Sequence, residues 1–164
     1  MKRIFFLGQA PARPSSDHEI PGTYLHNWLS SIGFSDDEII NNCHFFALTD
    51  TFPGSTKNGH LAPTKDQIEK HRPTLKQHII NLQPELVVPV GKMAITEILG
   101  DKRSSLNDIV GRQFSVNPFG VLKNEIVCIP LSHPSGRSAW NYLHKELVGD
   151  ALHLLEVSAR LDDR

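Results

Sequence analysis

The stretch that decides the fold is Leu131-Ser132-His133-Pro134-Ser135-Gly136-Arg137-Ser138, close to the carboxyl end of the 164-residue chain. The apolar run 126–131 leads into it and is typical of a buried strand. The residues after it, 139–143, predict the start of a helix. A histidine that follows a buried strand lies where open α/β sheets bind their ligands. We therefore expect His133 at the functional edge of a parallel sheet.

A second loop of the same kind follows the first apolar run, Ile4 to Leu7. It reads Gly8-Gln9-Ala10-Pro11-Ala12-Arg13-Pro14, and its glycine and two prolines exclude regular secondary structure. A stiff loop with free N–H groups at the end of a strand suits ligand recognition. A plain connection to the next helix is the alternative, and the matching loop around His133 favours the functional interpretation.

Two further apolar runs, 44–49 and 86–90, predict strands, and helical patterns lie between the four runs. This alternation predicts an α/β fold, a single domain over 1–164 with a four-stranded parallel sheet flanked by helices on both faces. The loops at 8–14, 50–62 and 132–138 then emerge at one edge of the sheet and surround one pocket.

The connecting segments carry more local signals. Ser35 and Thr64 each begin a capping-box pattern, and Pro73 predicts a kink or a break in the long helix that follows Thr64. The segment 112–121 predicts a small hairpin, and the amphipathic tail 142–161 predicts one or two closing helices.

Composition bounds the class of protein. Apolar residues make up 39% and charged residues 21% of the chain, and the net charge is -1, so any nucleic-acid binding depends on a local patch. No apolar run reaches the length of a membrane span, and the start is too short for a signal peptide. With Cys43 and Cys128 as its cysteines, the chain is expected to be a cytoplasmic monomer without disulfides, metal or cofactor.

The two loops carry a family resemblance. Gly8-Gln9-Ala10-Pro11 and His133-Pro134-Ser135 resemble the two signature motifs of the uracil-DNA glycosylase superfamily. Phe52-Pro53-Gly54, Pro63-Thr64 and the run 84–91 are similar to a bacterial branch related to the iron–sulfur (family 4 and family 5) glycosylases. The resemblance covers nearly the whole chain. It implies an enzyme that hydrolyses the N-glycosidic bond of uracil or another deaminated base flipped out of DNA.

The resemblance also implies roles for individual residues. His133 would donate a hydrogen bond to the base oxygen as charge builds there, and Gln9 would orient the base or a water molecule. Asp17 would orient the attacking water, with a solvated carboxylate as the alternative. The base would contact Gly8, Gln9, Ala10, Pro11, Phe46 and Ala47. The DNA backbone or groove would contact Ser135, Gly136, Arg137, Ser138 and Lys57, although the loop that holds Lys57 is equally typical of a solvated segment.

The chain departs from the family pattern at several positions. Cluster-bearing relatives have cysteines where this chain has Thr51 and His71, so we expect no iron–sulfur cluster. The Asn that reads the Watson–Crick edge of uracil is replaced near Ala47. A stacking aromatic is also not evident around Ile20. The candidates to replace that aromatic are Tyr24, Phe46 and Phe52.

Three functions therefore compete. The first is a monofunctional DNA glycosylase, which the Gln9 and His133 motifs favour. The second is a non-catalytic nucleic-acid or nucleobase-binding member of the same fold, which the missing Asn and aromatic favour. The third is an unrelated nucleotide-handling α/β enzyme, because a shared fold does not determine function.

Overall fold

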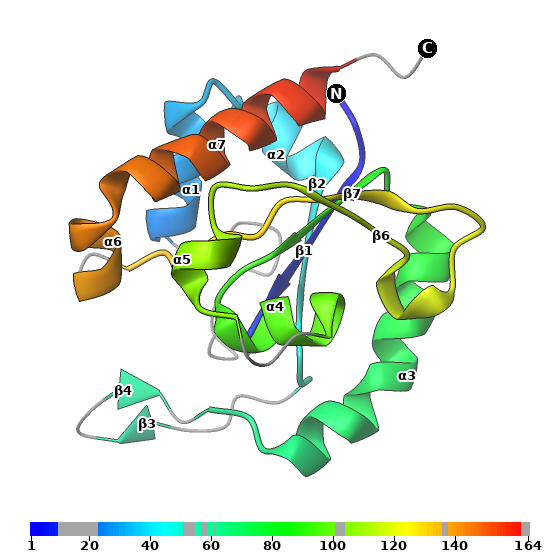
Figure 1. Ribbon diagram of the computed structural model, residues 1–164. Coiled ribbons are helices and arrows are strands. Elements are labelled where there is room, and N and C mark those ends of the chain that lie inside the picture. The colour runs from blue at the N-terminus through cyan, green and yellow to red at the C-terminus, as the bar shows by residue number, and fades with distance from the viewer. Residues whose placement is uncertain are drawn as a thin grey trace.

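The main sheet contains the four expected parallel strands and one more. The computed structural model describes residues 1–9, 23–50, 55–56, 59–60, 62–100, 104–135 and 138–161. The strand order is β2-β1-β5-β7-β6 (Figure 1). The bounds are β1 (Ile4–Gly8), β2 (Cys43–Ala47), β5 (Leu86–Pro89), β6 (Phe114–Val116) and β7 (Ile126–Cys128). The strands β2, β1, β5 and β7 are parallel, so the predicted four-stranded parallel sheet is confirmed.

The fifth strand comes from the segment that predicted a separate hairpin. β6 pairs with β7 in the antiparallel direction, with Phe114 opposite Cys128 and Val116 opposite Ile126. The hairpin therefore exists, but its second strand is the last strand of the parallel set. The 3-10 helix η1 (Pro118–Gly120) lies in the β6–β7 connection, 117–125. This connection precedes β7 and so lies at the sheet edge opposite to His133.

Strand β1 shows how the sheet divides two apolar layers. It pairs with β2 on one side and β5 on the other, and its side chains at 4–7 are almost completely buried. Ile4 and Phe6 belong to one cluster of buried side chains, and Phe5 and Leu7 belong to the other. Successive side chains of a strand point to opposite faces, so a continuous apolar run is what a sheet covered on both faces requires.

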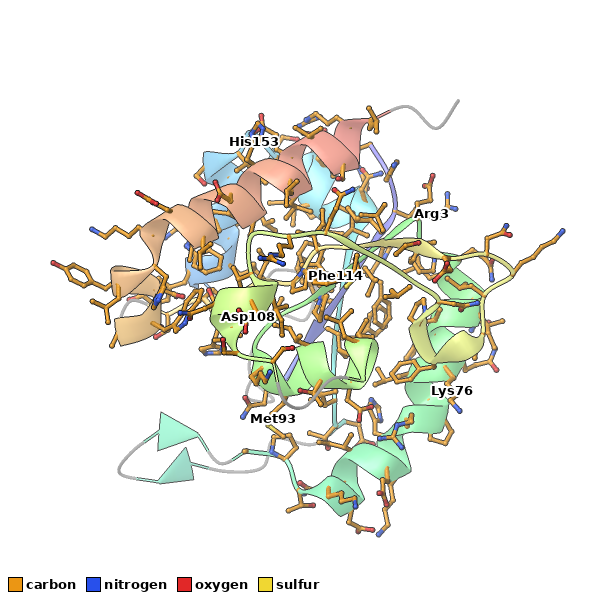
Figure 2. The ribbon with its side chains drawn as sticks, in the orientation of Figure 1. Arg3, Lys76, Met93, Asp108, Phe114 and His153 are labelled. Carbon is orange, nitrogen blue, oxygen red and sulfur yellow. The ribbon has the colours of Figure 1, made fainter. Side chains whose placement is uncertain are left out.

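Helices cover both faces, as predicted (Figure 1). The layer that contains Phe6 packs against α1 (Thr23–Ser31), α2 (Asp36–Asn42), α5 (Leu106–Ile109), α6 (Ala139–Leu143) and α7 (Lys145–Arg160). The layer that contains Phe5 packs against α3 (Lys65–Leu82) and α4 (Lys92–Leu99). Phe114 of β6 and Met93 of α4 complete this second layer, whereas His153 is exposed on the outer side of α7 (Figure 2). None of the helices in the described ranges is long and apolar enough to span a bilayer.

The helix starts are confirmed, and of the kink or break that Pro73 predicts, the structure excludes the break. Ser35 and Thr64 both form complete capping boxes. α3 continues through Pro73 as one helix of 18 residues, and Figure 1 shows its axis change direction along its length. Pro73 is exposed, and the inward side chains Ile68 and Leu75 on either side of it stay buried. Burial of this apolar face offsets the one backbone hydrogen bond that a proline removes.

The segment after β2 is not only a loop. β3 (Ser55–Thr56) and β4 (Gly59–His60) pair as a short antiparallel ribbon within the segment that the sequence predicts as a loop over 50–62. Two residues separate these strands, which is the commonest spacing in a β-hairpin. One of them, Lys57, lies outside the described residues.

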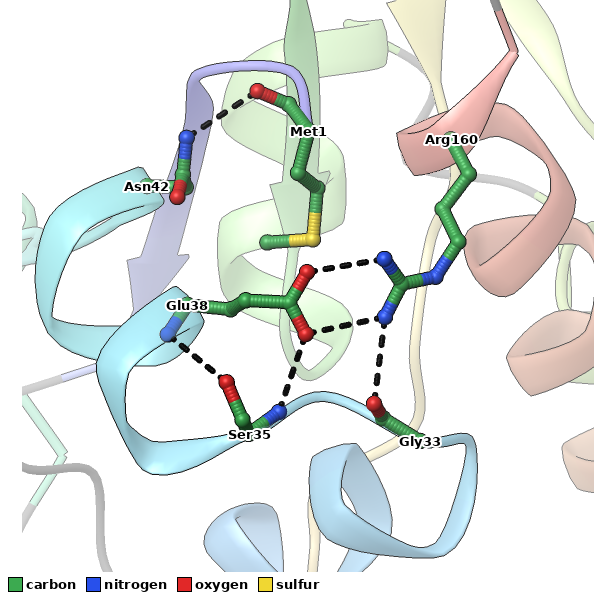
Figure 3. Close-up of polar contacts among 6 residues, drawn as sticks. All are labelled: Met1, Gly33, Ser35, Glu38, Asn42 and Arg160. Carbon is green, nitrogen blue, oxygen red and sulfur yellow. Dashed lines mark hydrogen bonds and ion pairs between the residues drawn. The ribbon is translucent and has the colours of Figure 1, made fainter.

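An ion pair fastens the end of α7 to the start of α2 (Figure 3). Arg160 Nη1 donates to Glu38 Oε2 at 2.7 Å, and Nη2 donates to Glu38 Oε1 at 3.0 Å and to the Gly33 carbonyl at 3.1 Å. The Ser35 backbone N–H donates to the same carboxylate at 3.1 Å. These bonds lower the pKa of Glu38 from 4.5 to about 2, and the hydrogen bond from Arg160 makes the largest contribution.

This shift makes a pH dependence testable. The carboxylate stabilises the fold while it is ionised, so its contribution is complete above about pH 4.5 and is lost as the pH falls toward 2. We expect Glu38→Gln to lower the melting temperature at pH 7 and to have a shrinking effect between pH 5 and 2. The control is Glu125→Gln on the exposed β6–β7 connection. A reduction of the melting temperature that stays the same from pH 5 to pH 2 would contradict the stabilising role of the ionised Glu38 carboxylate.

Candidate functional site

The carboxyl ends of the parallel strands meet at one edge and are joined by backbone hydrogen bonds. The Val90 N–H donates to the Leu7 carbonyl at 2.8 Å, and the Gly91 N–H donates to the Leu131 carbonyl at 2.9 Å. The Leu48 N–H donates to the Gly8 carbonyl at 3.0 Å on the other side of β1. The loops that begin at Gln9 and at Ser132 therefore start from the same edge, as expected. That they surround one pocket stays a prediction.

Gly91 lies between these two loops. It comes two residues after β5, which lies between β1 and β7, and it precedes α4 with φ of 89°, a conformation that favours glycine. A Cβ atom added there would lie 3.9 Å from the Cβ of His133. With strands about 4.8 Å apart, β1 and β7 are separated by about 10 Å. Gly91 itself contributes no side chain to this strand end, which lies between the ends that lead to Gln9 and to His133.

His133 is exposed, and the structure fixes its backbone from two directions. Leu131 forms a parallel bridge with Val90, and its N–H donates to the Pro89 carbonyl at 2.9 Å. From the other side, Asn141 Nδ2 donates to the His133 carbonyl at 2.9 Å. The backbone that carries the imidazole is therefore tied both to the sheet and to helix α6.

Asn141 also contacts the residue before His133. The hydroxyl of Ser132, which is only 2% exposed, donates to Asn141 Oδ1 at 2.6 Å. Sequence reasoning missed Asn141, because contacts across eight residues leave no periodic pattern. The Ser138–Asn141 spacing, typical of a helix cap, was the one available signal.

Two residues assigned to DNA contact also shape this loop. Ser138 is the N-cap of α6, and its Oγ accepts a hydrogen bond from the Asn141 N–H at 3.1 Å. The Ser138 N–H donates to the Ser135 carbonyl at 3.4 Å. These bonds bring 135 and 138 together at the start of α6. Their contact with DNA stays a prediction.

The predicted base-binding residues of β2 lie on the far side of β1 from His133. The Phe46 ring stacks on Phe5 at 4.7 Å between centroids and is 4.7 Å from the His78 ring. Phe46 thus belongs to the layer under α3, and the structure does not bring it next to His133. Ala47 pairs with Gly8 at the sheet edge. Tyr24, the second aromatic candidate, is exposed on α1.

The two cysteines do not share a site. Cys43 and Cys128 are buried in the two different apolar layers. Burial raises the pKa of each thiol to about 12, so both are protonated at neutral pH. The described residues contain no group of three or more His, Cys, Asp or Glu side chains that could hold a metal ion.

His71, which stands where relatives carry a cluster cysteine, is half-buried on α3. Desolvation lowers its pKa, and the charge of Asp50 acts in the opposite direction. The remaining sequence-predicted site residues lie outside the described part of the chain: Ala10, Pro11, Asp17, the aromatic candidate Phe52, Lys57, Gly136 and Arg137.

A comparison with known families identifies the class of the fold. The family model described as "Uracil DNA glycosylase superfamily" matches residues 1–155, which include both loops, the whole main sheet and α6. No curated protein matches the chain.

Proposed function

The chain belongs to the uracil DNA glycosylase superfamily, and on this premise we propose that it is a DNA glycosylase that removes uracil or another deaminated base. The observation that carries the proposal is His133, which is exposed in the segment after β7, on the sheet edge that Gly8 and Gln9 share. Its substrate would be a nucleotide extruded from the DNA stack, because the glycosidic bond is otherwise out of reach.

The proposed reaction needs a hydrogen-bond donor where the base leaves. As the N-glycosidic bond breaks, the sugar gains oxocarbenium character and the base departs with the electron pair as an anion. Water then adds to the anomeric carbon of the sugar and loses a proton. His133 would donate to the base oxygen, where charge appears only during bond cleavage, and the N–H groups near Gln9 and Ala10 would assist it.

Gln9 and Asp17 would have supporting roles. A neutral amide can orient the base or a water molecule through its donor and acceptor groups, but it cannot act as a general base. Asp17 would orient the attacking water. The geometry at Gly91 supports this arrangement, because a ring could lie over the glycine with Gln9 on one side and His133 on the other.

A binding protein without catalysis is the second candidate, and Ala47 favours it. This residue is the last of β2, pairs with Gly8 and offers a methyl group where an amide would read the base edge. Such a protein would bind uracil-containing DNA and leave the bond intact.

A substrate panel tests the proposal and separates the two candidates. Wild-type protein is incubated with single- and double-stranded oligonucleotides that contain uracil, hypoxanthine or xanthine, and free base is measured by chromatography. We expect release of at least one of these bases in a time-dependent manner. Binding of the same oligonucleotides without any release would support the non-catalytic candidate.

The 135–138 loop would contact the duplex, and Arg137 gives a test of this role. An arginine in the vacated stack or on a phosphate contributes before chemistry begins. We expect Arg137→Ala to weaken duplex binding and to reduce the slope of log K against log salt by about 1. Single-stranded substrate should be less affected, because nothing needs to be extruded.

The matched control is Lys123→Ala, which removes one positive charge from the β6–β7 connection at the opposite edge of the sheet. Duplex affinity should stay near that of the wild type in this variant. An equal loss for Arg137→Ala on single and double strands, or an equal loss for Lys123→Ala, would contradict the assignment.

A further inference from the structure

We propose that Asn141 is the positioning residue for His133, and that it sets the rate of base release without touching the substrate. This inference rests on the proposed function of His133. It concerns a residue outside both motif loops, on helix α6. The clamp consists of two bonds from one amide: Nδ2 to the His133 carbonyl at 2.9 Å and Oδ1 from the Ser132 hydroxyl at 2.6 Å.

The polarity of the clamp follows from chemistry. A backbone carbonyl only accepts hydrogen bonds, so the amide group that faces the His133 carbonyl must be the NH₂. Oδ1 then faces Ser132, whose hydroxyl must donate. Ser132 is buried, so this pair would leave unsatisfied polar groups if the amide rotated or were removed. The amide therefore has one favourable orientation, and it holds the backbone of two successive loop residues.

Helix α6 itself is held in place from outside the loop. A helix of five residues is too short to be stable alone. Its start is capped by Ser138, and Trp140 Nε1 donates to Asn107 Oδ1 on α5 at 2.8 Å. His144 stacks on the Trp140 ring at 4.5 Å between centroids. These contacts with α5 fix the position of Asn141, and Asn141 in turn fixes the backbone of His133.

A donor aimed at a developing charge works only in the correct place. A misplacement of about 1 Å at a reacting group can lower a rate by as much as 10². Pro134 follows His133 immediately and has no backbone N–H, so the peptide group between them has the His133 carbonyl as its hydrogen-bonding group. Asn141 Nδ2 donates to this carbonyl and so holds the main chain directly before Pro134.

The decisive variant is Asn141→Asp, which keeps the size and one acceptor. A carboxylate can still accept from Ser132, but it has no N–H for the His133 carbonyl and presents a second acceptor to it. The matched control is Asn117→Asp in the β6–β7 connection. Asn117 is also half-buried, donates from Nδ2 to the Leu122 carbonyl at 2.7 Å and accepts from the Leu122 N–H at 2.9 Å, and it lies at the opposite sheet edge.

Two measurements on the full chain test the inference. In single turnover, we expect Asn141→Asp to release base roughly 10 to 100 times more slowly than wild type, with DNA affinity within about twofold. The rate of base release should fall less in Ser132→Ala than in Asn141→Asp, because the hydrogen bond from Asn141 to the His133 carbonyl remains. Asn117→Asp should keep the wild-type rate. A wild-type rate in Asn141→Asp, or equal losses in rate and affinity, would overturn the inference.

The second measurement does not depend on activity. The ¹³C resonance of the His133 carbonyl should shift in Asn141→Asp and stay unchanged in Asn117→Asp. An unshifted carbonyl in Asn141→Asp would overturn the clamp even if the rate fell. If wild type releases no base while the carbonyl shifts as expected, the clamp stands and the proposed glycosylase function fails.

Discussion

Replacing His133 with alanine is expected to slow base release in a single turnover by roughly 10² to 10³, the usual cost of losing one donor to a developing oxyanion. The imidazole would act only as the bond breaks, so the ground-state affinity for DNA should change little. Its backbone is fixed by the Val90–Leu131 bridge and by Asn141, and both contacts use main-chain atoms that the substitution leaves in place. Single-turnover kinetics and DNA titration measure the two quantities separately.

The matched control is His153→Ala, an exposed histidine on the outer side of α7 (Figure 2). This variant should release base at the wild-type rate. An unchanged rate in His133→Ala would show that this histidine does not donate to the departing base. A large loss of affinity in the same variant would mean that it binds the ground state instead of the departing base.

The second large effect is on stability. Phe5 is completely buried in the central strand β1 and stacks on Phe46. Its replacement by alanine removes a whole ring from a close-packed layer, so we expect a loss of about 3–5 kcal/mol in the free energy of unfolding. Urea denaturation measures this loss. Phe114→Ala on the half-buried edge strand β6 should lose less, and a larger loss for Phe114→Ala than for Phe5→Ala would contradict the layer assignment.

Most of the architecture follows from the sequence because β1, β5 and β7 are apolar runs. A strand covered on both faces shows no alternation, and the runs at 4–7 and 86–90 are of this kind. Helical patterns between such runs leave a parallel sheet as the simplest arrangement. The capping boxes at Ser35 and Thr64 then mark where two helices begin, because their side chains satisfy backbone N–H groups that a helix start leaves open.

Short elements were predicted only in part, for a physical reason. β6 has three residues and the ribbon 55–60 has strands of two, so neither is long enough for a period to emerge. The side of the sheet to which Phe46 points was equally hard to predict, because β2 (Cys43–Ala47) has no regular alternation of polar and apolar residues. Its ring belongs to the layer beneath α3 because Phe5, its stacking partner, points there.

The candidate site was only partly accessible to sequence reasoning. Strand ends identify the edge where Gln9 and His133 lie, because parallel strands share a direction. The clamp by Asn141 depends on the path of the loop and on α6, which no local pattern encodes. Gly91 was expected to allow close packing of strand and helix. The structure adds that it separates the two motif loops without a side chain.

The most direct test of the proposed glycosylase function is the release of free uracil from a single-stranded oligonucleotide with one uracil, with protein in excess. We expect free uracil and abasic sites in equal amounts, an unbroken DNA backbone, and release that is slower by roughly 10² to 10³ in His133→Ala. DNA that is bound but retains all of its uracil, or wild-type release by the alanine variant, would contradict it.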